Sequence, residues 1–576
     1  MLPPEQELKN LMEGLLLSVG SSFDHNSAAH ILIALVREMD LTHGNLWLLP
    51  ATGRTDYHSA LAAARMIGFG YPAGLRQVYP AVAQVRCATH FFAGTMPGDI
   101  EWAQEILYQS GKAAISLRLL DGIPGGLVSL IRPSPFEFVF RYNHTACGIE
   151  YFDELDLSVV EEEFAVRIED ELARQDLLVT DETEALMRRS MSSPCNQFIS
   201  YDPPDEVWDL FLQRASYWLL LQTAGYDFGP EDAFGGIRYD VYREAVRYLI
   251  AYGTMHTHYC RLLALQNPDI DEGVLLTYID SKQRIVEDLS SFLEITESDA
   301  TEVMGCLCLT PEHYEKYLEE PGAPPPPYLM MSDTQVIRST AGCLANPCGF
   351  LNRMLKIRHP LDHSKMVNRR EDRFIKDLGR LFEGERFIRI EKPVPVTIEK
   401  PVPGKKKKKD TDIDAVIYDT HTKSLGLFQL KWQDPLGESV RLRRTKAENF
   451  FEANEWVDIV CKWLQQRNGA EILKETQVMP QQPAQDALGE IFLFVLGRHN
   501  VHYTNSTPDA RAVWGSWHGV MASRIQVAAF MEDDPIRELY TKLWLYQGEN
   551  RLGRDEFPPA EYGMRLGPYH IQHLGR

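Results

Sequence analysis

The 576-residue sequence lacks any uninterrupted run of about 18 apolar residues, the length that a helix needs to cross a bilayer. Residues 1–8 lack the basic segment followed by an apolar one that marks a secretory signal peptide. A P-loop, a Gly-x-Ser-x-Gly nucleophile motif and a long internal repeat are also missing. We therefore expect a cytoplasmic protein that is neither a membrane protein, an NTP-driven motor nor a serine hydrolase.

Cysteine is sparse, with nine residues scattered along the chain, and an odd number fits reduced thiols better than a disulfide framework. His256 and Cys260 lie one turn apart on a predicted helix, but two ligands are too few for a closed zinc site. A C-x-C pair followed by a C-x4-C pair also departs from the usual zinc-ribbon arrangement, which disfavours zinc binding by Cys306, Cys308, Cys343 and Cys348.

Charge is unevenly distributed along the chain. The formal net charge is −22, but residues 353–446 hold 24 Lys and Arg against 14 Asp and Glu, a local excess of ten positive charges. Because Lys and Arg supply phosphate contacts, a basic segment within an acidic chain favours local binding of a polyanion. The alternative is a solvated charge distribution without a partner.

Two apolar-alternating runs, residues 411–419 and 425–432, flank a turn-forming segment and predict a β-hairpin. Side chains alternate between the two faces of a strand. Asp414 is therefore expected on one face of the first strand, and Gln429 and Lys431 on one face of the second. A buried charge is costly unless it is paired or bound to a metal, so this gathering of a carboxylate, an amide and an ammonium indicates a functional site.

This pattern resembles the PD-(D/E)XK nuclease superfamily, in which an Asp ends one strand and a D/E/Q-x-K tripeptide lies on the next. The matching residues are Asp414, Gln429 and Lys431, and the resemblance covers roughly residues 345–520. Glutamine stands where most members have an acid, as in the Mrr-like restriction enzymes. The resemblance implies a restriction-endonuclease-like α/β core, with element order α-β-β-β-α-β, and a Mg²⁺- or Mn²⁺-dependent phosphodiesterase.

The resemblance also implies a role for each residue. Asp414 binds the metal through its carboxylate, while Gln429 and the backbone carbonyl of Leu430 add the oxygen ligands that Mg²⁺ prefers. Lys431 positions or helps to deprotonate the attacking water. Asp412, expected on the same strand face as Asp414, is a supporting candidate.

A predicted helix at residues 368–382 carries one apolar stripe, and Glu371 lies on or beside it. The first core helix of the superfamily often directs a Glu at the metal, so Glu371 is a candidate catalytic residue and metal ligand. The alternative is a Glu that only complements the helix dipole. A strand at 386–398, a helix at 442–464 and a strand at 490–496 complete the implied order of elements.

Two basic groups flank the predicted hairpin. We interpret the lysine run before it as a phosphate-grasping arm, with a solubilising loop as the alternative, and the arginine group after it as a second phosphate-contact set or an exposed helix face. These two groups predict that the partner is a nucleic acid, and DNA is the nucleic acid that we expect. The candidate nucleic-acid-binding residues are Lys405, Lys406, Lys407, Lys408, Lys409, Arg441, Arg443 and Arg444.

Composition and periodicity divide the chain into four segments. Residues 1–320 form a mainly helical region of one or two subdomains, with a long helix at 239–266. A proline-rich linker is expected at 321–334, the nuclease-like domain at 335–530, and a C-terminal helix and tail at 531–576.

The leading functional hypothesis is a Mg²⁺-dependent nuclease that acts on DNA. A helical region followed by a nuclease-like domain is an arrangement found in bacterial defence systems. By this analogy the nuclease is the effector of a bacterial defence or DNA-processing system, and the helical region is its sensor. The alternative is an inactive nuclease-fold module that binds nucleic acid or a protein partner. The acidic N-terminal region is the candidate surface for a protein partner or for oligomerisation.

Overall fold

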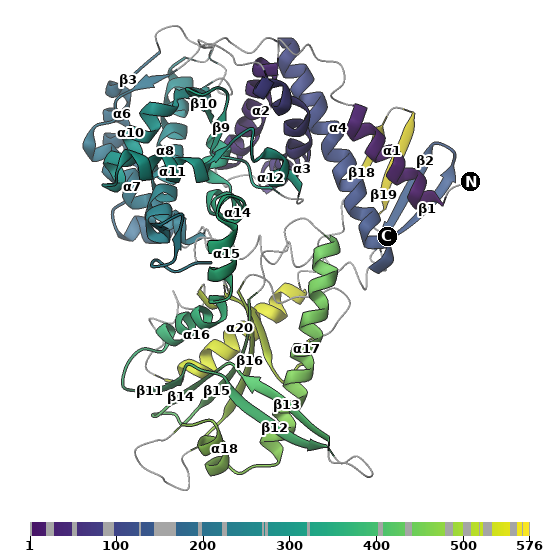
Figure 1. Cartoon of the computed structure of the whole chain (residues 1–576), viewed down its shortest axis with the longest axis vertical. Coiled ribbons are helices and arrows are strands. Elements are labelled where there is room, and N and C mark those ends of the chain that lie inside the picture. The colour runs from purple at the N-terminus through teal and green to yellow at the C-terminus, as the bar shows by residue number, and fades with distance from the viewer. Residues whose placement is uncertain are drawn as a thin grey trace.

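The computed structural model shows a helical body and a sheet domain (Figure 1). We use "helical body" for the described residues up to 367 together with the last two strands of the chain, and "sheet domain" for those from 370 to 552. The structure describes residues 3–18, 28–48, 54–84, 97–125, 128–142, 169–193, 199–221, 227–267, 270, 275–319, 323–400, 407–432, 440–478, 488–498, 508–517, 519–521, 533–552, 562–566 and 568–574.

Two hydrophobic clusters hold most helices of the helical body together. One surrounds α8 (Tyr239–Gln266), which coincides with the helix predicted there, and the other lies between α2 (Ala28–Leu48) and α3 (Arg54–Gln84). The other helices of the body are α1 (Pro4–Ser18), α4 (Pro97–Gly122), α6 (Asp181–Ser190), α7 (Asp205–Trp218), α10 (Lys282–Leu293), α11 (Glu297–Leu307), α12 (Tyr314–Glu319), α13 (Thr340–Leu344), α14 (Pro347–Arg358) and α15 (Pro360–Val367).

Small sheets complete the helical body. One has the strand order β7-β10-β9-β8, and two short antiparallel pairs join β3 to β4 and β5 to β6. Their bounds are β3 (Met191–Ser192), β4 (Ser200–Tyr201), β5 (Ala233–Phe234), β6 (Ile237–Arg238), β7 (Tyr278–Ser281), β8 (Cys308–Leu309), β9 (Tyr328–Met330) and β10 (Gln335–Arg338).

The proline-rich segment does not act as a linker, contrary to the division predicted from the sequence. Pro325, Pro326 and Pro327 are buried, and the chain continues directly into β9 inside the body. A Cβ added at Gly342 would lie 2.1 Å from the carbonyl oxygen of Pro326, so α13 packs closely against the segment. Prolines here remove backbone donors from a packed interior instead of spacing two domains. The passage to the sheet domain occurs through α15.

The end of the chain returns to its beginning. Strands β18 (Tyr562–Leu566) and β19 (Tyr569–Leu574) form one sheet with β1 (Val128–Ser134) and β2 (Glu137–Tyr142), in the order β1-β2-β19-β18, with β19 parallel to β2. Figure 1 shows this sheet beside α1 and α4. The predicted C-terminal tail is therefore part of the helical body, because Ile571 of β19 belongs to the apolar cluster around Phe138 and Phe140.

The sheet domain has five strands in the order β11-β14-β15-β16-β17. The β11/β14 and β14/β15 pairs are antiparallel, and β15/β16 and β16/β17 are parallel. The elements occur in the predicted order, with an additional hairpin of β12 and β13 before β14. Their bounds are α16 (Arg370–Leu381), β11 (Phe387–Ile390), β12 (Val394–Lys400), β13 (Lys407–Ile413), β14 (Ala415–Asp419), β15 (Leu425–Lys431), α17 (Val440–Gln465), α18 (Gly469–Glu475), β16 (Ile491–Gly497), β17 (Val513–Ser516) and α20 (Pro535–Leu552).

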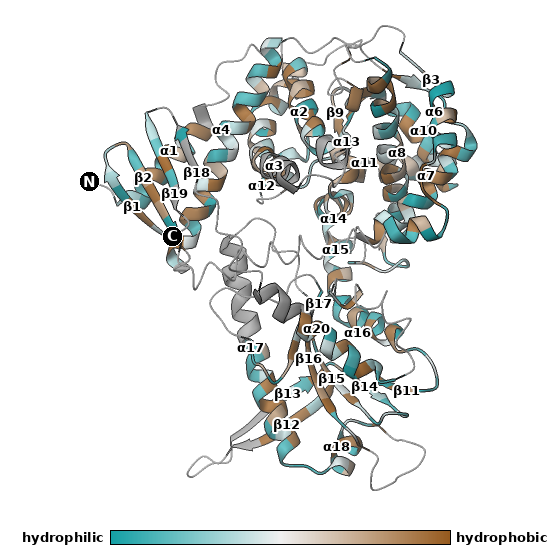
Figure 2. Cartoon of the chain, turned by 180° about the vertical axis from the view of Figure 1, so that it is seen from behind, coloured by the Kyte–Doolittle hydropathy of each residue, from teal (hydrophilic) through white to brown (hydrophobic). Residues whose placement is uncertain are grey.

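Helices cover both faces of this sheet. Helices α16 and α20 pack on the face that carries Phe428 and Leu430, and α17 and α18 pack on the face that carries Leu425 and Leu427. The central strands β15 and β16 are accordingly brown in the hydropathy colouring of Figure 2. A strand buried on both faces has a nearly continuous apolar sequence, which explains the composition of both strands. Among the helices of the described residues, none combines the length and apolarity that a membrane span requires.

The hairpin predicted at 411–432 is present, and its turn has a polar anchor. Buried Asp419 accepts hydrogen bonds from the backbone N–H of His421 (3.0 Å), the hydroxyl of Thr422 (2.8 Å) and Nε of Arg386 (2.8 Å). Lys423 has φ of +61°, a left-handed conformation that a tight turn requires. Side-chain bonds to the turn backbone thus fix the register of β14 on β15.

Candidate active site

The first strand of the predicted hairpin breaks at Asp414. Strand β13 ends at Ile413 and pairs with β12, whereas β14 begins at Ala415 and enters the five-stranded sheet. The side chains two residues apart point to opposite faces of the sheet at this point, because Ile413 belongs to the cluster under α17 and Ala415 to the cluster under α16. The break places the Asp414 carboxylate beside the end of β15, where no β14 residue continues the antiparallel ladder.

The Asp414 carboxylate is bound from two sides. Its Oδ2 accepts a 2.6 Å hydrogen bond from the backbone N–H of Leu430 and another from Nε2 of Gln429. The backbone N–H of Asp414 in turn donates to the carbonyl oxygen of Phe428 at 3.0 Å. These three contacts lock the carboxylate against β15.

Gln429 and Leu430 are the other two predicted metal ligands. Gln429 is 7 % exposed and directs its amide nitrogen, not the expected oxygen, at Asp414. Exchange of amide nitrogen and oxygen by rotation would present the oxygen to a cation. Because the N–H and C=O of one strand residue point to the same edge, the carbonyl of Leu430 also faces the side of Asp414. Gln429 and Leu430, the residues predicted to supply oxygen ligands, are therefore both adjacent to Asp414.

Burial raises the pKa of Asp414 to about 6, from an ordinary 3.8, and the negative charge of Glu371 adds to this effect. The N–H of Leu430, the positive charge of Lys431 and the amide of Gln429 act in the opposite direction but do not offset it. A cation bound at Asp414 would relieve this cost, since an opposite charge nearby favours the ionised carboxylate.

Glu371 and Lys431 come to Asp414 from two different elements of the sheet domain. Glu371 is exposed in the first turn of α16, which packs through Phe374 and Leu378 on one face of the sheet. Lys431 is the last residue of β15. The charges of both residues act on the Asp414 carboxylate, so Glu371 and Lys431 lie within electrostatic range of it, while Gln429 is hydrogen-bonded to it directly.

The supporting candidate Asp412 does not share the position of Asp414. It is exposed on β13, and its backbone carbonyl accepts a 2.7 Å bond from the indole Nε1 of Trp456 on α17. The expectation of a common face assumed an unbroken strand. The bend at Asp414 separates the two carboxylates, so Asp412 has a backbone role in seating β13 on α17.

Arg498 is a component of this region that was not predicted from the sequence. It follows β16, is 2 % exposed, and donates from its backbone N–H to the carbonyl of Lys431 at 2.9 Å. Its guanidinium lies over the ring of Trp432 (4.6 Å to the centroid) and bonds Asp377 of α16 at 3.0 Å. Arg498 therefore joins the end of β15 to the helix that carries Glu371. A lone Arg directly after a buried strand was the available signal.

A second group of arginines attaches this helix to the helical body. Arg373 donates to the buried carboxylate of Asp232 at 2.8 Å, and Arg370 lies 3.9 Å from that of Asp227. The guanidinium of Arg370 also lies over the ring of Phe228, 4.8 Å from its centroid. The 227–232 segment of the body thus contacts the same turn of α16 from which Glu371 projects.

The predicted phosphate-binding residues lie near the site along the chain. Lys405 and Lys406 fall outside the described residues. The backbone of Lys407–Lys409 belongs to β13, which pairs with β12 in register from Lys400↔Lys407 to Val394↔Ile413. The predicted strand at 386–398 is therefore two strands, β11 and β12, in different sheets. Arg441, Arg443 and Arg444 lie in the first turns of α17, and their side chains are outside the described part.

The cysteines and histidines weighed in the sequence are mostly core residues. His256 is buried, with Nδ1 2.8 Å from the hydroxyl of Tyr201 and Nε2 3.0 Å from the carbonyl of Leu275. The four cysteines at 306, 308, 343 and 348 are all buried and free, and they form no zinc ribbon with one another in the described part of the chain.

Comparison of the chain with protein-family models, curated sequences and solved structures gives no match. The geometry around Asp414 is therefore the basis for assigning a function to this chain.

Proposed function

We propose that the protein is a Mg²⁺-dependent nuclease that hydrolyses phosphodiester bonds of DNA. The observation that carries this proposal is the Asp414 carboxylate, which lies at a strand break, is hydrogen-bonded by Gln429 and by the backbone of Leu430, and is within electrostatic range of Lys431 and Glu371. The predicted restriction-endonuclease-like core is supported by the order of elements and by the position of the site at the end of β15. Mn²⁺ is the expected substitute for Mg²⁺.

The donor set fits a hard cation. Asp414, the carbonyl of Leu430 and the amide oxygen of Gln429 are oxygen donors, and Glu371 supplies one more carboxylate from α16. Mg²⁺ keeps several waters and binds through few protein ligands, so a sparse set is adequate. The bound ion supplies Lewis acidity and a bound water of lowered pKa.

The remaining residues orient the reaction. Lys431 places a positive charge beside Asp414, where it holds the attacking water and offsets negative charge that develops on the phosphate. Glu371 accepts a proton from this water or orients it. Arg498 is a positioning residue, because it bonds the backbone of Lys431 and ties it to α16.

DNA approaches along the hairpin of β12 and β13. A strand rises about 3.3 Å per residue, so the backbone of Lys409 lies about 16 Å from Asp414. Phosphates of one strand of DNA are about 3.4 Å apart along the helix axis, so the lysine run meets the backbone about five nucleotides from the cut. The arm fixes position without reading sequence.

The helical body is proposed as a sensor that acts on α16. Its 227–232 segment pairs with Arg370 and Arg373, one turn from Glu371, so a movement of the body changes the position of this carboxylate. Such coupling suits the effector of a bacterial defence or DNA-processing system, and the acidic surface of the body suits a protein partner. Free thiols at all described cysteines suit a cytoplasmic location.

The second candidate function is a nuclease-fold module that binds nucleic acid or a protein without cutting. Gln429 favours it, because its amide nitrogen satisfies Asp414 with no metal. Retention of both Asp414 and Lys431 favours catalysis.

Incubation of the full chain with supercoiled plasmid, linear duplex, single-stranded DNA and RNA separates these functions. We expect metal-dependent cleavage of DNA with Mg²⁺ or Mn²⁺ and none with EDTA. Binding of DNA without any cleavage, in every metal, would favour the second function.

A further inference from the structure

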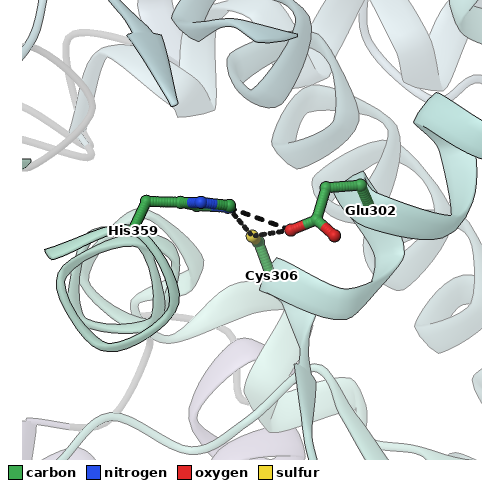
Figure 3. Close-up of side chains that lie close together, drawn as sticks. All are labelled: Glu302, Cys306 and His359. Atoms are coloured by element: carbon green, nitrogen blue, oxygen red, sulfur yellow. Dashed lines mark hydrogen bonds and ion pairs between the residues drawn. The ribbon is translucent and has the colours of Figure 1, made fainter. Parts of the chain in front are cut away.

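We propose that Glu302, Cys306 and His359 form a binding site for a zinc-class transition-metal ion in the helical body. Figure 3 shows the three side chains converging from two elements. Among the residues that the structure describes, they are the one group of three or more His, Cys, Asp or Glu whose ligand atoms all lie within 4.8 Å of one another. The site is separate from the proposed magnesium site and does not depend on it.

The distances between ligand atoms match a tetrahedral site. Nε2 of His359 is 2.9 Å from Oε1 of Glu302 and 3.9 Å from Sγ of Cys306, and Sγ is 3.7 Å from Oε1. Zn–N and Zn–O bonds of about 2.0–2.1 Å and Zn–S bonds of about 2.3 Å give tetrahedral edges of about 3.3–3.6 Å. Metal binding therefore requires movements of about 0.5 Å or less.

Local structure holds the ligands in place. Glu302 and Cys306 are one turn apart on α11, so their side chains lie on one face. His359 lies between α14 and α15, followed by Pro360, and its backbone N–H bonds the carbonyl of Leu355 at 2.8 Å. Gly235 leaves room for the imidazole, because a Cβ there would lie 2.5 Å from Cε1 of His359.

The surroundings suit a metal with one open position. Cys306 is fully buried, whereas the side chains of His359 and Glu302 are 16 % and 30 % exposed, so solvent can supply a fourth ligand. Burial raises the pKa of the Cys306 thiol to about 12, although the positive charge of Arg358 and a hydrogen bond from Tyr242 act in the opposite direction. Metal binding therefore releases the thiol proton to solvent and forms the thiolate.

Arg358 is the competing cation. Its guanidinium bonds Oε2 of Glu302 at 2.8 Å and Oε1 at 3.0 and 3.2 Å. A metal on Oε1 replaces the two longer contacts and leaves the shorter one, which then orients the carboxylate from its outer oxygen. The mixed nitrogen, sulfur and oxygen set selects Zn²⁺ or Co²⁺ over Mg²⁺. Repulsion by Arg358 weakens binding, so removal of its charge should tighten it.

A metal at this position would cross-link α11 to the junction of α14 and α15, the helices of the body that lead to the sheet domain. Helix α11 contacts α14, and α15 follows His359 and leads into α16. Metal loading should therefore raise the thermal midpoint of unfolding of the full chain, by mass action.

Cobalt titration of the chelator-treated full chain tests the proposal. We expect one equivalent of Co²⁺, a sulfur-to-cobalt charge-transfer absorption band, and displacement of Co²⁺ by Zn²⁺. Cys306→Ser should abolish the band, and the matched buried-cysteine control Cys348→Ser should retain it. Arg358→Gln should bind Co²⁺ more tightly than the unchanged chain.

Absence of the band in the folded, unchanged chain, or its persistence in Cys306→Ser, would overturn the proposal. Glu302 and His359 would then form only a hydrogen-bonded ion pair. If Cys306→Ser does not fold, His359→Gln and Glu302→Gln replace it. Each should weaken Co²⁺ binding more than about tenfold, since even outer-shell partners contribute 10- to 100-fold. Unchanged binding in both would equally overturn the proposal.

Discussion

Replacement of Asp414 by Asn should stabilise the metal-free protein while it removes the proposed activity. The pKa of Asp414 is raised to about 6 by burial, so its ionised form is unfavourable in the folded state. Each pKa unit corresponds to about 1.4 kcal/mol, so the change from 3.8 to about 6 costs roughly 3 kcal/mol at pH 7. Asn keeps an acceptor for the N–H of Leu430 but not a carboxylate, and we expect a net gain of about 1–3 kcal/mol.

The gain should depend on pH with a defined sign. A carboxyl whose pKa is raised by folding contributes stability in its neutral form below pH 3.8, and this contribution is lost as pH rises through about 6. The difference between Asp414→Asn and the unchanged chain should therefore be small at pH 4 and reach its maximum above pH 7.

Thermal and urea unfolding followed by tryptophan fluorescence at pH 4 to 8, in EDTA, measures this difference. Asp412→Asn is the matched control, because Asp412 is exposed two residues away, and it should change stability by less than about 0.5 kcal/mol. Mg²⁺ should stabilise the unchanged chain and leave Asp414→Asn unaffected. If Asp414→Asn is destabilised at pH 7, the reasoning about an unfavourable buried charge is refuted.

Three further predictions concern the same site. Cleavage with Mg²⁺ should rise as pH increases through about 6, because only ionised Asp414 binds the cation; a rate that is flat from pH 5 to 8 in a single-turnover assay contradicts this. Gln429→Glu should retain cleavage and bind Mg²⁺ or Mn²⁺ more tightly by calorimetry, and a folded variant that binds metal but does not cut would show that the amide has another role. Substitution of the five lysines at 405–409 by Ser should make DNA binding less sensitive to salt. The slope of log K against log salt should fall in magnitude by about 1 to 3, since each phosphate contact contributes roughly 0.9. An unchanged slope would identify the run as a solubilising loop.

The contact of Gln429 with Asp414 could be anticipated from the sequence, whereas the burial of the proline-rich segment could not. Asp414, Gln429 and Lys431 could be placed together because alternation along two short strands is a local property. The hairpin turn could also be predicted, since the side chains of Asp419 and Thr422 accept hydrogen bonds from backbone N–H groups of the turn. The placement of Glu371 required a helix to pack over the sheet, and its apolar stripe gave that information.

Long-range partners account for most of the rest. The role of the proline-rich segment depends on its burial under α13, and the pairing of β19 with β2 joins residues more than 400 positions apart. The bend at Asp414 was hidden because Ile413 and Ala415 are both apolar, so a change of face leaves the alternation pattern unaltered. The place of Arg498 after a buried strand could be read from the sequence, but its contact with Lys431 could not, because it depends on the parallel pairing of β15 with β16.

Cleavage by a four-member set of proteins tests the central claim most directly. The set is the unchanged chain, Asp414→Ala, Lys431→Ala and the double variant, each assayed with supercoiled DNA in Mg²⁺ and in EDTA, with folding checked by circular dichroism. The account predicts metal-dependent cleavage by the unchanged chain alone. The double variant should cleave only slightly more slowly than either single variant, because groups that act as a unit give non-additive losses of rate. Cleavage near the unchanged rate by both single variants would contradict the assignment of Asp414 and Lys431 as the catalytic centre.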